Sequence, residues 1–265
     1  MKIGFYSPYL NILGGGEYYI LSMASILSKK HEVDVFGDKS LQKKAESFFG
    51  IDLKNVNFIP RVDTKFSRII GSRKYDRFYY VTDGSLFVSL AKKNFLIVQV
   101  PQKNMYDWNI KNKAKLTFWP KVLVYSNYVK KYIDEWWHTN ALIFPPAIDC
   151  REFQTLKKEN IILSVGRFFP LPHSKKQEVL VSAFKNLYKK GLRDLKLILA
   201  GGVDSKGEKY FKSIKDQARD LPVEFYPNIE RKQLLKLYGS AKLYWHATGF
   251  GENLTENPER AEHFG

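Results

Sequence analysis

The sequence has little cysteine and no long apolar run. Cys150 is the only cysteine in 265 residues, so the chain can form no intrachain disulfide and no cysteine-based metal site. No stretch approaches the ~20 consecutive apolar residues that a membrane-spanning helix needs. The first residues, Met1 to Pro8, are too few and too polar for a signal peptide, so we expect them to begin a strand. Together these absences favour a cytoplasmic protein.

Basic residues, in contrast, are in excess. Lysine and arginine number 43 against 27 acidic residues, which gives a formal net charge of +16 at pH 7, spread over both halves of the chain. Three partners suit such a charge: nucleic acid, an anionic membrane surface or phosphate-bearing small molecules. A lysine-rich surface without any anionic ligand is the alternative. No RNP, zinc-finger or KH signature accompanies the charge, so we expect no nucleic-acid partner.

Short apolar runs alternate with helical patterns along the whole chain, which is typical of a doubly wound parallel sheet. The expected strands are Lys2–Tyr6, Glu32–Phe36, Val56–Ile59, Phe78–Val81, Phe95–Val100, Val122–Tyr125, Ala141–Phe144, Ile161–Val165, Leu195–Ala200, Val223–Tyr226 and Lys242–Trp245. The expected helices are Gly16–Lys30, Lys39–Phe49, one capped by Ser126 and ending near Trp137, Lys176–Lys190, 205–219 and Glu230–Tyr238.

A break in this alternation divides the chain. Pro145-Pro146 and the polar stretch Cys150–Asn160 separate two series of strands and helices. We therefore predict two α/β domains, residues 1–150 and residues 151–265, each a Rossmann-like half of about five or more strands.

A glycine-rich loop opens the first expected helix. Gly14, Gly15 and Gly16 are followed by Glu17. Glycines let the backbone approach a ligand closely, and a helix N-terminus favours an anion. The loop is neither G-x-G-x-x-G nor a P-loop, which weakens the dinucleotide and P-loop interpretations. An ordinary tight turn is the alternative.

Two cations follow the first expected strand of the second domain. Gly166-Arg167 ends this strand, and Lys175 and Lys176 stand at the start of the next helix. Arginine offers a bidentate fork to phosphate oxygens, and lysine offers a point charge. Cations at the mouth of one strand-to-helix loop suit a nucleotide diphosphate, with Lys175 favoured by its spacing and Lys176 second. A solvated arginine and a basic helix start are the alternative.

Three further loops follow strands in the second domain. They contain Gly201-Gly202, Asn228-Ile229, and the polar, Gly-rich segment from His246 to the end of the chain. Open α/β sheets hold ligands outside the carboxyl ends of their strands, so these loops are candidate ligand contacts.

These motifs together resemble the retaining glycosyltransferases of family 4. The most specific parts are Gly166-Arg167…Lys175, the linker Pro145–Asp149, and Glu262-His263-Phe264-Gly265. The last resembles the start of a motif in which two glutamates are separated by seven residues, and the second would fall beyond Gly265. The chain thus resembles a member that stops inside this motif, and we expect it to be weakly active or inactive as it stands. The resemblance implies the GT-B fold, with two Rossmann-like domains facing across a cleft and the second one incomplete.

The resemblance also implies an activity and its residues. A hexose would move from a UDP-, GDP- or ADP-sugar to an acceptor hydroxyl with retention. No metal or other cofactor would be needed, because Arg167 and Lys175 replace a divalent ion, in line with the absence of Asp-x-Asp. Arg167, Lys175 and Glu262 would be catalytic. The implied donor-binding residues are Gly15, Gly16, Gly166, Lys176, Gly201, Gly202, Asn228, Ile229, His246, Gly249, His263, Phe264 and Gly265.

The residues that would contact the acceptor match the motifs of the family less closely. Glu17, Gln99 and Gln102 are the implied contacts, although Gln stands where many family members have a histidine. A glycan or a lipid-linked sugar is the acceptor class that the resemblance implies. The basic and aromatic segment Lys103 to Lys121 suits an anionic membrane surface, with core aromatics as the alternative. The runner-up function is a non-catalytic homologue or fragment that binds a nucleotide-sugar or a polyanion.

Overall fold

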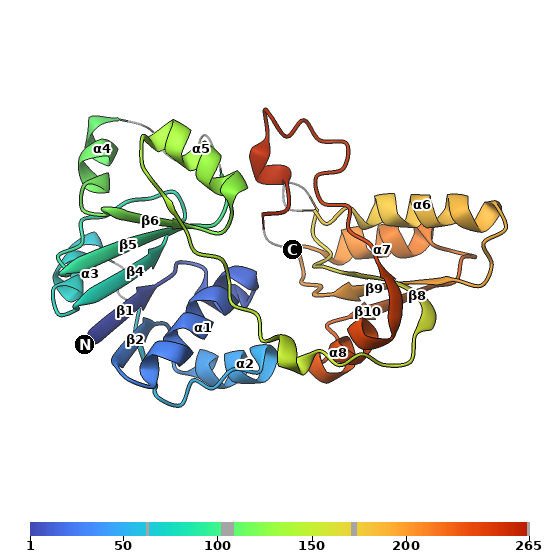
Figure 1. Ribbon diagram of the computed structural model, residues 1–265, viewed down its shortest axis with the longest axis horizontal. Coiled ribbons are helices and arrows are strands. Elements are labelled where there is room, and N and C mark those ends of the chain that lie inside the picture. Colours follow the sequence, from blue (N-terminus) through green and yellow to red (C-terminus); the bar gives the residue numbers. More distant parts are fainter. Residues whose placement is uncertain (62–63, 102–108, 171–173, 264–265) are drawn as a thin grey trace. The chain divides into compact units, whose positions relative to one another are not determined.

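The computed structural model describes residues 1–61, 64–101, 109–170 and 174–263. The chain forms two compact units (Figure 1), one of Met1–Ile148 together with His263 and the other of Asp149–Glu262. Each unit is built on its own parallel sheet, and each is described by itself.

The first unit contains a seven-stranded parallel sheet in the order β3-β2-β1-β4-β5-β6-β7. Its strands are β1 (Lys2–Tyr6), β2 (Glu32–Phe36), β3 (Val56–Ile59), β4 (Arg77–Val81), β5 (Lys93–Val98), β6 (Lys121–Val124) and β7 (Leu142–Ile143). Its helices are α1 (Gly15–Ser28), α2 (Ser40–Phe49), α3 (Lys65–Ser72), α4 (Ile110–Leu116) and α5 (Asn127–Trp137). The strand order reverses between β1 and β4, so the carboxyl ends of these strands border the usual ligand-binding position of an open sheet.

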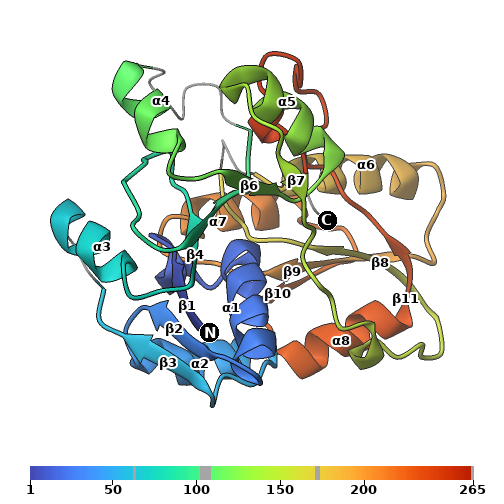
Figure 2. The same ribbon diagram turned by 60° about the vertical axis from the view of Figure 1, so that its left-hand side comes forward.

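Helices cover both faces of this sheet (Figure 2), which explains why its strands are apolar on both sides. Ile3 and Phe5 of β1 pack in the core that contains residues of α1 and α2. Tyr80 of β4 packs with Trp119 in the core that contains residues of α5. The buried Trp119 indole donates a 2.8 Å hydrogen bond to the Phe87 carbonyl. These two cores fix the carboxyl edge of the sheet.

The second unit contains a four-stranded parallel sheet in the order β10-β9-β8-β11. Its elements are β8 (Glu159–Val165), α6 (Gln177–Lys189), β9 (Lys196–Gly201), α7 (Glu208–Gln217), β10 (Val223–Pro227), α8 (Arg231–Ser240) and β11 (Ala241–Tyr244). The expectation of five or more strands is wrong for the described part of this unit, because it contains only four apolar runs of strand length. The strand order reverses between β8 and β11.

The expected strands are all present, with bounds that differ by no more than two residues. The sequence predicts neither α3 nor α4. No residue of α4 is buried, so this helix has no apolar stripe to reveal it. On α3, Phe66 and Ile70 are exposed, and the apolar residues therefore do not mark a core-facing side.

Candidate functional site

The predicted site residues of the second unit lie at the carboxyl ends of its strands. Gly166 and Arg167 follow β8, Gly201 ends β9, Asn228 follows β10, and His246 follows β11. The strands are all parallel, so these residues share one edge of the sheet. This edge includes the reversal between β8 and β11, where open α/β sheets bind ligands.

Two glycines allow segments at this edge to touch. A Cβ atom on Gly166 would lie 2.6 Å from Cγ of Lys175. Gly201 has a φ of +154°, and its Cβ would lie 2.0 Å from the Gly166 carbonyl oxygen. Neither gap accommodates a carbon atom, so both positions require glycine. At Gly202 a Cβ would meet Cγ of Arg167 at 3.5 Å, an ordinary contact.

Arg167 is the more accessible of the two predicted catalytic cations. Its guanidinium lies over the Phe169 ring, 5.5 Å from the ring centroid. The side chain is exposed, and no carboxylate of the described chain pairs with it. Its charge is therefore available to an anion in solution.

Lys175 is paired inside the protein. Its ammonium forms an ion pair with Oε2 of Glu262, and the same oxygen lies 3.1 Å from Nε2 of His246. Burial raises the pKa of the Glu262 carboxyl. The charge and hydrogen bond of Lys175, together with His246, outweigh burial and hold that pKa below its usual range. The structure thus brings together three predicted residues from two separate stretches of sequence.

Lys176 has a different environment. It ion-pairs with Glu252 and donates a 2.6 Å hydrogen bond to the Phe250 carbonyl. Glu252 also accepts a 2.6 Å hydrogen bond from Arg260. These contacts fasten the loop after β11 to the start of α6. Both lysines are paired, but the Lys175 side chain is 32% exposed and that of Lys176 only 13%, so Lys175 is the better placed of the two to meet a ligand.

The side chain of Asn228 forms hydrogen bonds with the backbone of the protein. Its side-chain amide accepts from the Val203 N–H at 2.9 Å and donates to the Val203 carbonyl at 3.2 Å. Its own N–H donates to the Gly201 carbonyl at 2.9 Å. The predicted contact of Asn228 and Ile229 with a nucleotide base stays a prediction. Gly249 has a φ of +82° and lies beside Ala261, where it forms a turn of the terminal loop.

Gln177 and Tyr210 support the site without having been predicted. The Gln177 amide, 2% exposed, donates to the carbonyls of Gly166 at 3.2 Å and Arg167 at 3.1 Å. Its carbonyl accepts from the Tyr210 hydroxyl at 3.0 Å. Gln177 stands within a uniformly polar run in the sequence, so no pattern marks it as buried.

In the first unit, Glu17 and Gln99, two of the predicted acceptor-side residues, lie against the glycine loop. The Glu17 carboxylate, 5% exposed, accepts from the Gly14 N–H at 2.8 Å and caps α1. A Cβ on Gly16 would lie 2.4 Å from Nε2 of Gln99, whereas Gly15 has no atom within 4 Å of that position. Glu17 and Gln99 shape the loop in this structure, and their contact with an acceptor stays a prediction.

Three predicted residues are not described: Gln102, Phe264 and Gly265 lie outside the described residues. His263 belongs to the first unit, and its contact with a donor stays a prediction. In the described parts of the chain, no group of three or more acidic, histidine or cysteine side chains could hold a metal ion. None of the described helices is both long and apolar enough to cross a membrane.

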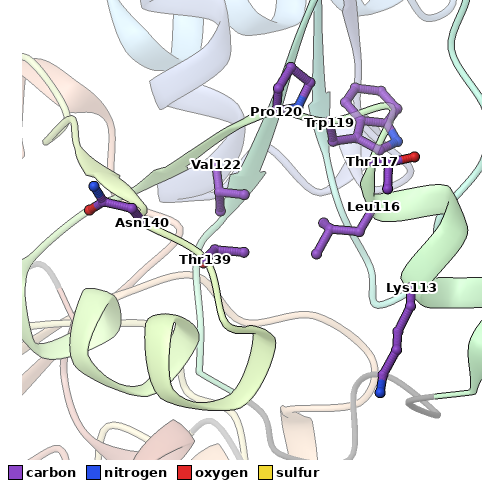
Figure 3. A pocket seen from close by; sticks show the side chains of 8 residues that line it. All are labelled: Lys113, Leu116, Thr117, Trp119, Pro120, Val122, Thr139 and Asn140. Atoms are coloured by element: carbon purple, nitrogen blue, oxygen red, sulfur yellow. The ribbon is translucent and has the colours of Figure 1, made fainter.

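One cavity of the first unit lies at the opposite, amino-terminal edge of the sheet, near the start of β6. Its volume is about 260 Å³. Figure 3 shows that the amine of Lys113, its one charged residue, points away from Leu116, Val122 and Thr139. This cavity therefore lacks the convergent charges of a site for an anionic ligand.

The Lys175–Glu262 pair predicts a pH dependence. The pKa of Glu262 is lowered in the folded protein, so the pair stabilises above the unfolded pKa, and this stabilisation disappears as pH falls below about 4.3. At pH 7, Glu262→Gln should lower the free energy of unfolding by about 0.2–1 kcal/mol, as for other partly exposed pairs. Urea unfolding at pH 7 and pH 3.5 tests this, and a difference between the proteins that is as large at pH 3.5 as at pH 7 contradicts it.

Comparison with known proteins finds a family model that resembles the second unit. Residues 149–265 match the family model described as Glycosyl transferases group 1. The chain is also 23% identical over 266 residues to a curated protein of Campylobacter jejuni subsp. jejuni serotype O:2. The match covers 92% of this chain and 72% of that protein, whose name is GalNAc-alpha-(1->4)-GalNAc-alpha-(1->3)-diNAcBac-PP-undecaprenol alpha-1,4-N-acetyl-D-galactosaminyltransferase.

Solved structures agree on the fold. Anabaena HepE, in complex with UDP and glucose, matches with a TM-score of 0.65 and 16% identity over 93% of this chain and 74% of its own. The trehalose-6-phosphate synthase OtsA matches with a TM-score of 0.57 and 7% identity over 98% of this chain and 82% of its own. The fold is GT-B, and the expected fold class is confirmed. Membership of family 4 itself stays a prediction.

Proposed function

We propose that the protein is a retaining, metal-independent glycosyltransferase that moves a hexose from a nucleotide-diphospho-sugar to an acceptor hydroxyl. The observation that carries this proposal is the arrangement of Arg167, Lys175 and Glu262 at the carboxyl edge of the second sheet. A diphosphate needs cations, and a sugar needs an acceptor of hydroxyl hydrogen bonds. These three side chains supply both from neighbouring loops.

Each residue has a distinct task in the proposed reaction. The guanidinium of Arg167 and the ammonium of Lys175 stabilise the departing diphosphate, on which negative charge develops. Glu262, oriented by Lys175 and His246, accepts hydrogen bonds from the donor sugar. Gln177 holds the carbonyls of Gly166 and Arg167 and so positions the cation.

The proposed reaction breaks one bond at the anomeric carbon of the donor sugar and forms another. The bond between the anomeric carbon and the diphosphate oxygen breaks through an oxocarbenium-like transition state. The acceptor oxygen bonds to the same carbon on the same face, which preserves its configuration. We propose a direct attack on that face, because we identify no nucleophile among the described side chains at this edge. The acceptor proton passes to the departing phosphate oxygen, which lies on the same face as the attacking oxygen.

The comparisons support the choice of substrates. The family model describes glycosyl transferases, and HepE was solved with UDP and glucose. The name of the Campylobacter jejuni relative specifies a lipid-linked acceptor. We accordingly place UDP first among the candidate donor nucleotides and a glycan or lipid-linked sugar as the acceptor. The proposed location is the cytoplasm, with peripheral contact to the inner face of an anionic membrane.

Calorimetric titration with UDP, GDP and ADP in the presence of a chelator tests the proposal. We expect selective binding of one nucleotide. Arg167→Ala should weaken it by about 10- to 150-fold, the value of a hydrogen bond to a charged group. Arg193→Ala is the matched control, because Arg193 is exposed and stacks on Tyr188, before the amino end of β9.

Three results would contradict parts of the proposal. Binding of no nucleotide, or equal affinities in Arg167→Ala and the wild type, would rule out the diphosphate site. Binding that requires a divalent ion would rule out metal independence.

A further inference from the structure

A larger cavity lies in the first unit at the carboxyl ends of β1, β2 and β3. Its volume is about 670 Å³, a size common among small-molecule sites. Leu10, Phe36 and Phe58 give it apolar walls, and Asn11, Lys39 and Arg61 add polar and cationic groups. Apolar walls with a few convergent polar groups are typical of a ligand site.

Two arginines at this edge lack an acidic partner. Arg61 donates a 2.9 Å hydrogen bond to the Pro8 carbonyl, and its guanidinium lies 5.8 Å from the centroid of the Tyr6 ring. Arg68 lies 5.5 Å from the same ring and 5.5 Å from that of Phe87. Within the described chain neither arginine forms an ion pair, and the buried Nε of Arg68 has no hydrogen-bond partner.

The one acid that lines the cavity forms no ion pair with these cations in the described chain. The carboxylate of Asp38 accepts a 2.7 Å hydrogen bond from the Ser40 N–H, and its hydrogen bonds with Ser40 lower its pKa, so it stays ionised. Lys39 and Arg61 both line the cavity with it, so two cations face one carboxylate. The described lining therefore has a net positive charge, which favours an anion.

The position of Tyr6 supplies an independent argument. Tyr6 is the last residue of β1 and pairs in register with Tyr80 of β4, so its ring stands where the strand order of the sheet reverses. Ligands of open α/β sheets bind at this reversal. Two guanidiniums lie against the ring at that position.

We propose that this cavity binds the phosphate or diphosphate group of the acceptor. Arg61 and Lys39, which line the cavity, hold that group, and Arg68 assists them from the Tyr6 ring that it shares with Arg61. The planar guanidiniums suit phosphate oxygens, and the apolar walls accept the hydrocarbon attached to the phosphate. This inference rests on the proposed function, because it assigns the site to the acceptor of the transfer reaction. It narrows the acceptor class to phosphate esters with an apolar neighbour.

Titration of the full chain with geranyl diphosphate and with inorganic pyrophosphate tests the inference. The titrations use an Arg167→Ala background, which weakens phosphate binding by the second unit. We expect geranyl diphosphate to bind more tightly than pyrophosphate. Arg61→Ala and Arg68→Gln should each weaken geranyl diphosphate binding about tenfold or more. Arg73→Ala is the matched control, since Arg73 is exposed at the end of α3 and outside the cavity.

Three other outcomes would contradict the proposed site or its ligand. Equal affinities of Arg61→Ala and Arg73→Ala, with unchanged melting temperatures, would overturn the site. Equal binding of the two probes would overturn the role of the apolar walls. Phosphatidylglycerol vesicles test a lipid headgroup as the source of the phosphate. Loss of vesicle binding in Arg61→Ala, with geranyl diphosphate binding retained, would show that the site binds a lipid headgroup and not the phosphate group of the acceptor.

A separate titration distinguishes this inference from the proposed function. With Arg167 intact, Arg61→Ala should retain the nucleotide affinity of the wild type. A wild type that binds geranyl diphosphate through Arg61 and no nucleotide would overturn the proposed function and keep the anion site. A wild type that binds nucleotide and no geranyl diphosphate would overturn the anion site and keep the proposed function.

Discussion

Lys175→Ala is expected to lower the rate of sugar transfer by about 100- to 1,000-fold, the effect of removing one preorganised donor from a developing negative charge. The ammonium of Lys175 lies beside Glu262, and Cγ of the same side chain lies close to Gly166, in the loop between β8 and α6. The charge on the diphosphate grows as the glycosidic bond breaks. The loss should therefore appear mainly in kcat, with a smaller effect on KM for the donor.

Two other lysines of α6 and its start provide the comparison. Lys185→Ala removes the same charge from an exposed position on the helix and should leave kcat unchanged. Lys176→Ala should act through stability, because Lys176 fastens the terminal loop through Glu252. A kcat for Lys175→Ala within threefold of that for Lys185→Ala would remove Lys175 from the proposed mechanism.

Gly201→Ala is expected to destabilise the protein by about 2–6 kcal/mol, the sum of a strained φ and of overpacking at a closed contact. The φ of Gly201 is +154°, and the new Cβ would lie 2.0 Å from the Gly166 carbonyl oxygen. Both atoms are fixed by the backbone, so no side-chain rotation relieves the overlap. Relief requires separating the ends of β8 and β9, which should also abolish nucleotide binding.

The neighbouring glycine is the control for this prediction. Gly202→Ala adds the same methyl group, but the nearest atom is Cγ of Arg167 at 3.5 Å, an ordinary contact. Urea unfolding of both variants compares their stabilities. Destabilisation by less than about 1 kcal/mol in Gly201→Ala, or an equal loss in both variants, would contradict the close contact between the two strand ends.

Much of the fold could be predicted because buried parallel strands are apolar on both faces. β1 and β9 are short apolar runs, and each is followed by glycines at the carboxyl edge. The same rule could not reveal the helices α4 and α3. α4 has no buried residue and so leaves no periodic signal. On α3, Phe66, Ile69 and Ile70 do have helical spacing, but the helix has only eight residues, fewer than the window over which such spacing can be recognised.

The sequence predicts part of the candidate site from position alone. Arg167 was predicted because it follows a strand end, and Lys175 because of its spacing at the start of the next helix; their roles stay predictions. The pairing of Lys175 with Glu262 joins positions 87 residues apart, and no local pattern specifies it. Gln177 was missed because its burial depends on the carbonyls of Gly166 and Arg167, which lie 11 and 10 residues before it. Arg61 and Arg68 were also missed, because only the structure shows that both guanidiniums lie against the ring of Tyr6.

The ion pair between Lys175 and Glu262 has a consequence for how a donor would bind. Glu262 acts as an internal counter-ion, so an arriving diphosphate exchanges with a carboxylate at Lys175 and not with water alone. The exchange costs part of the attraction between phosphate and lysine. In return, the lysine side chain is already ordered before the donor arrives, which reduces the entropy lost on binding. The displaced carboxylate becomes free at the moment when the sugar hydroxyls need a partner.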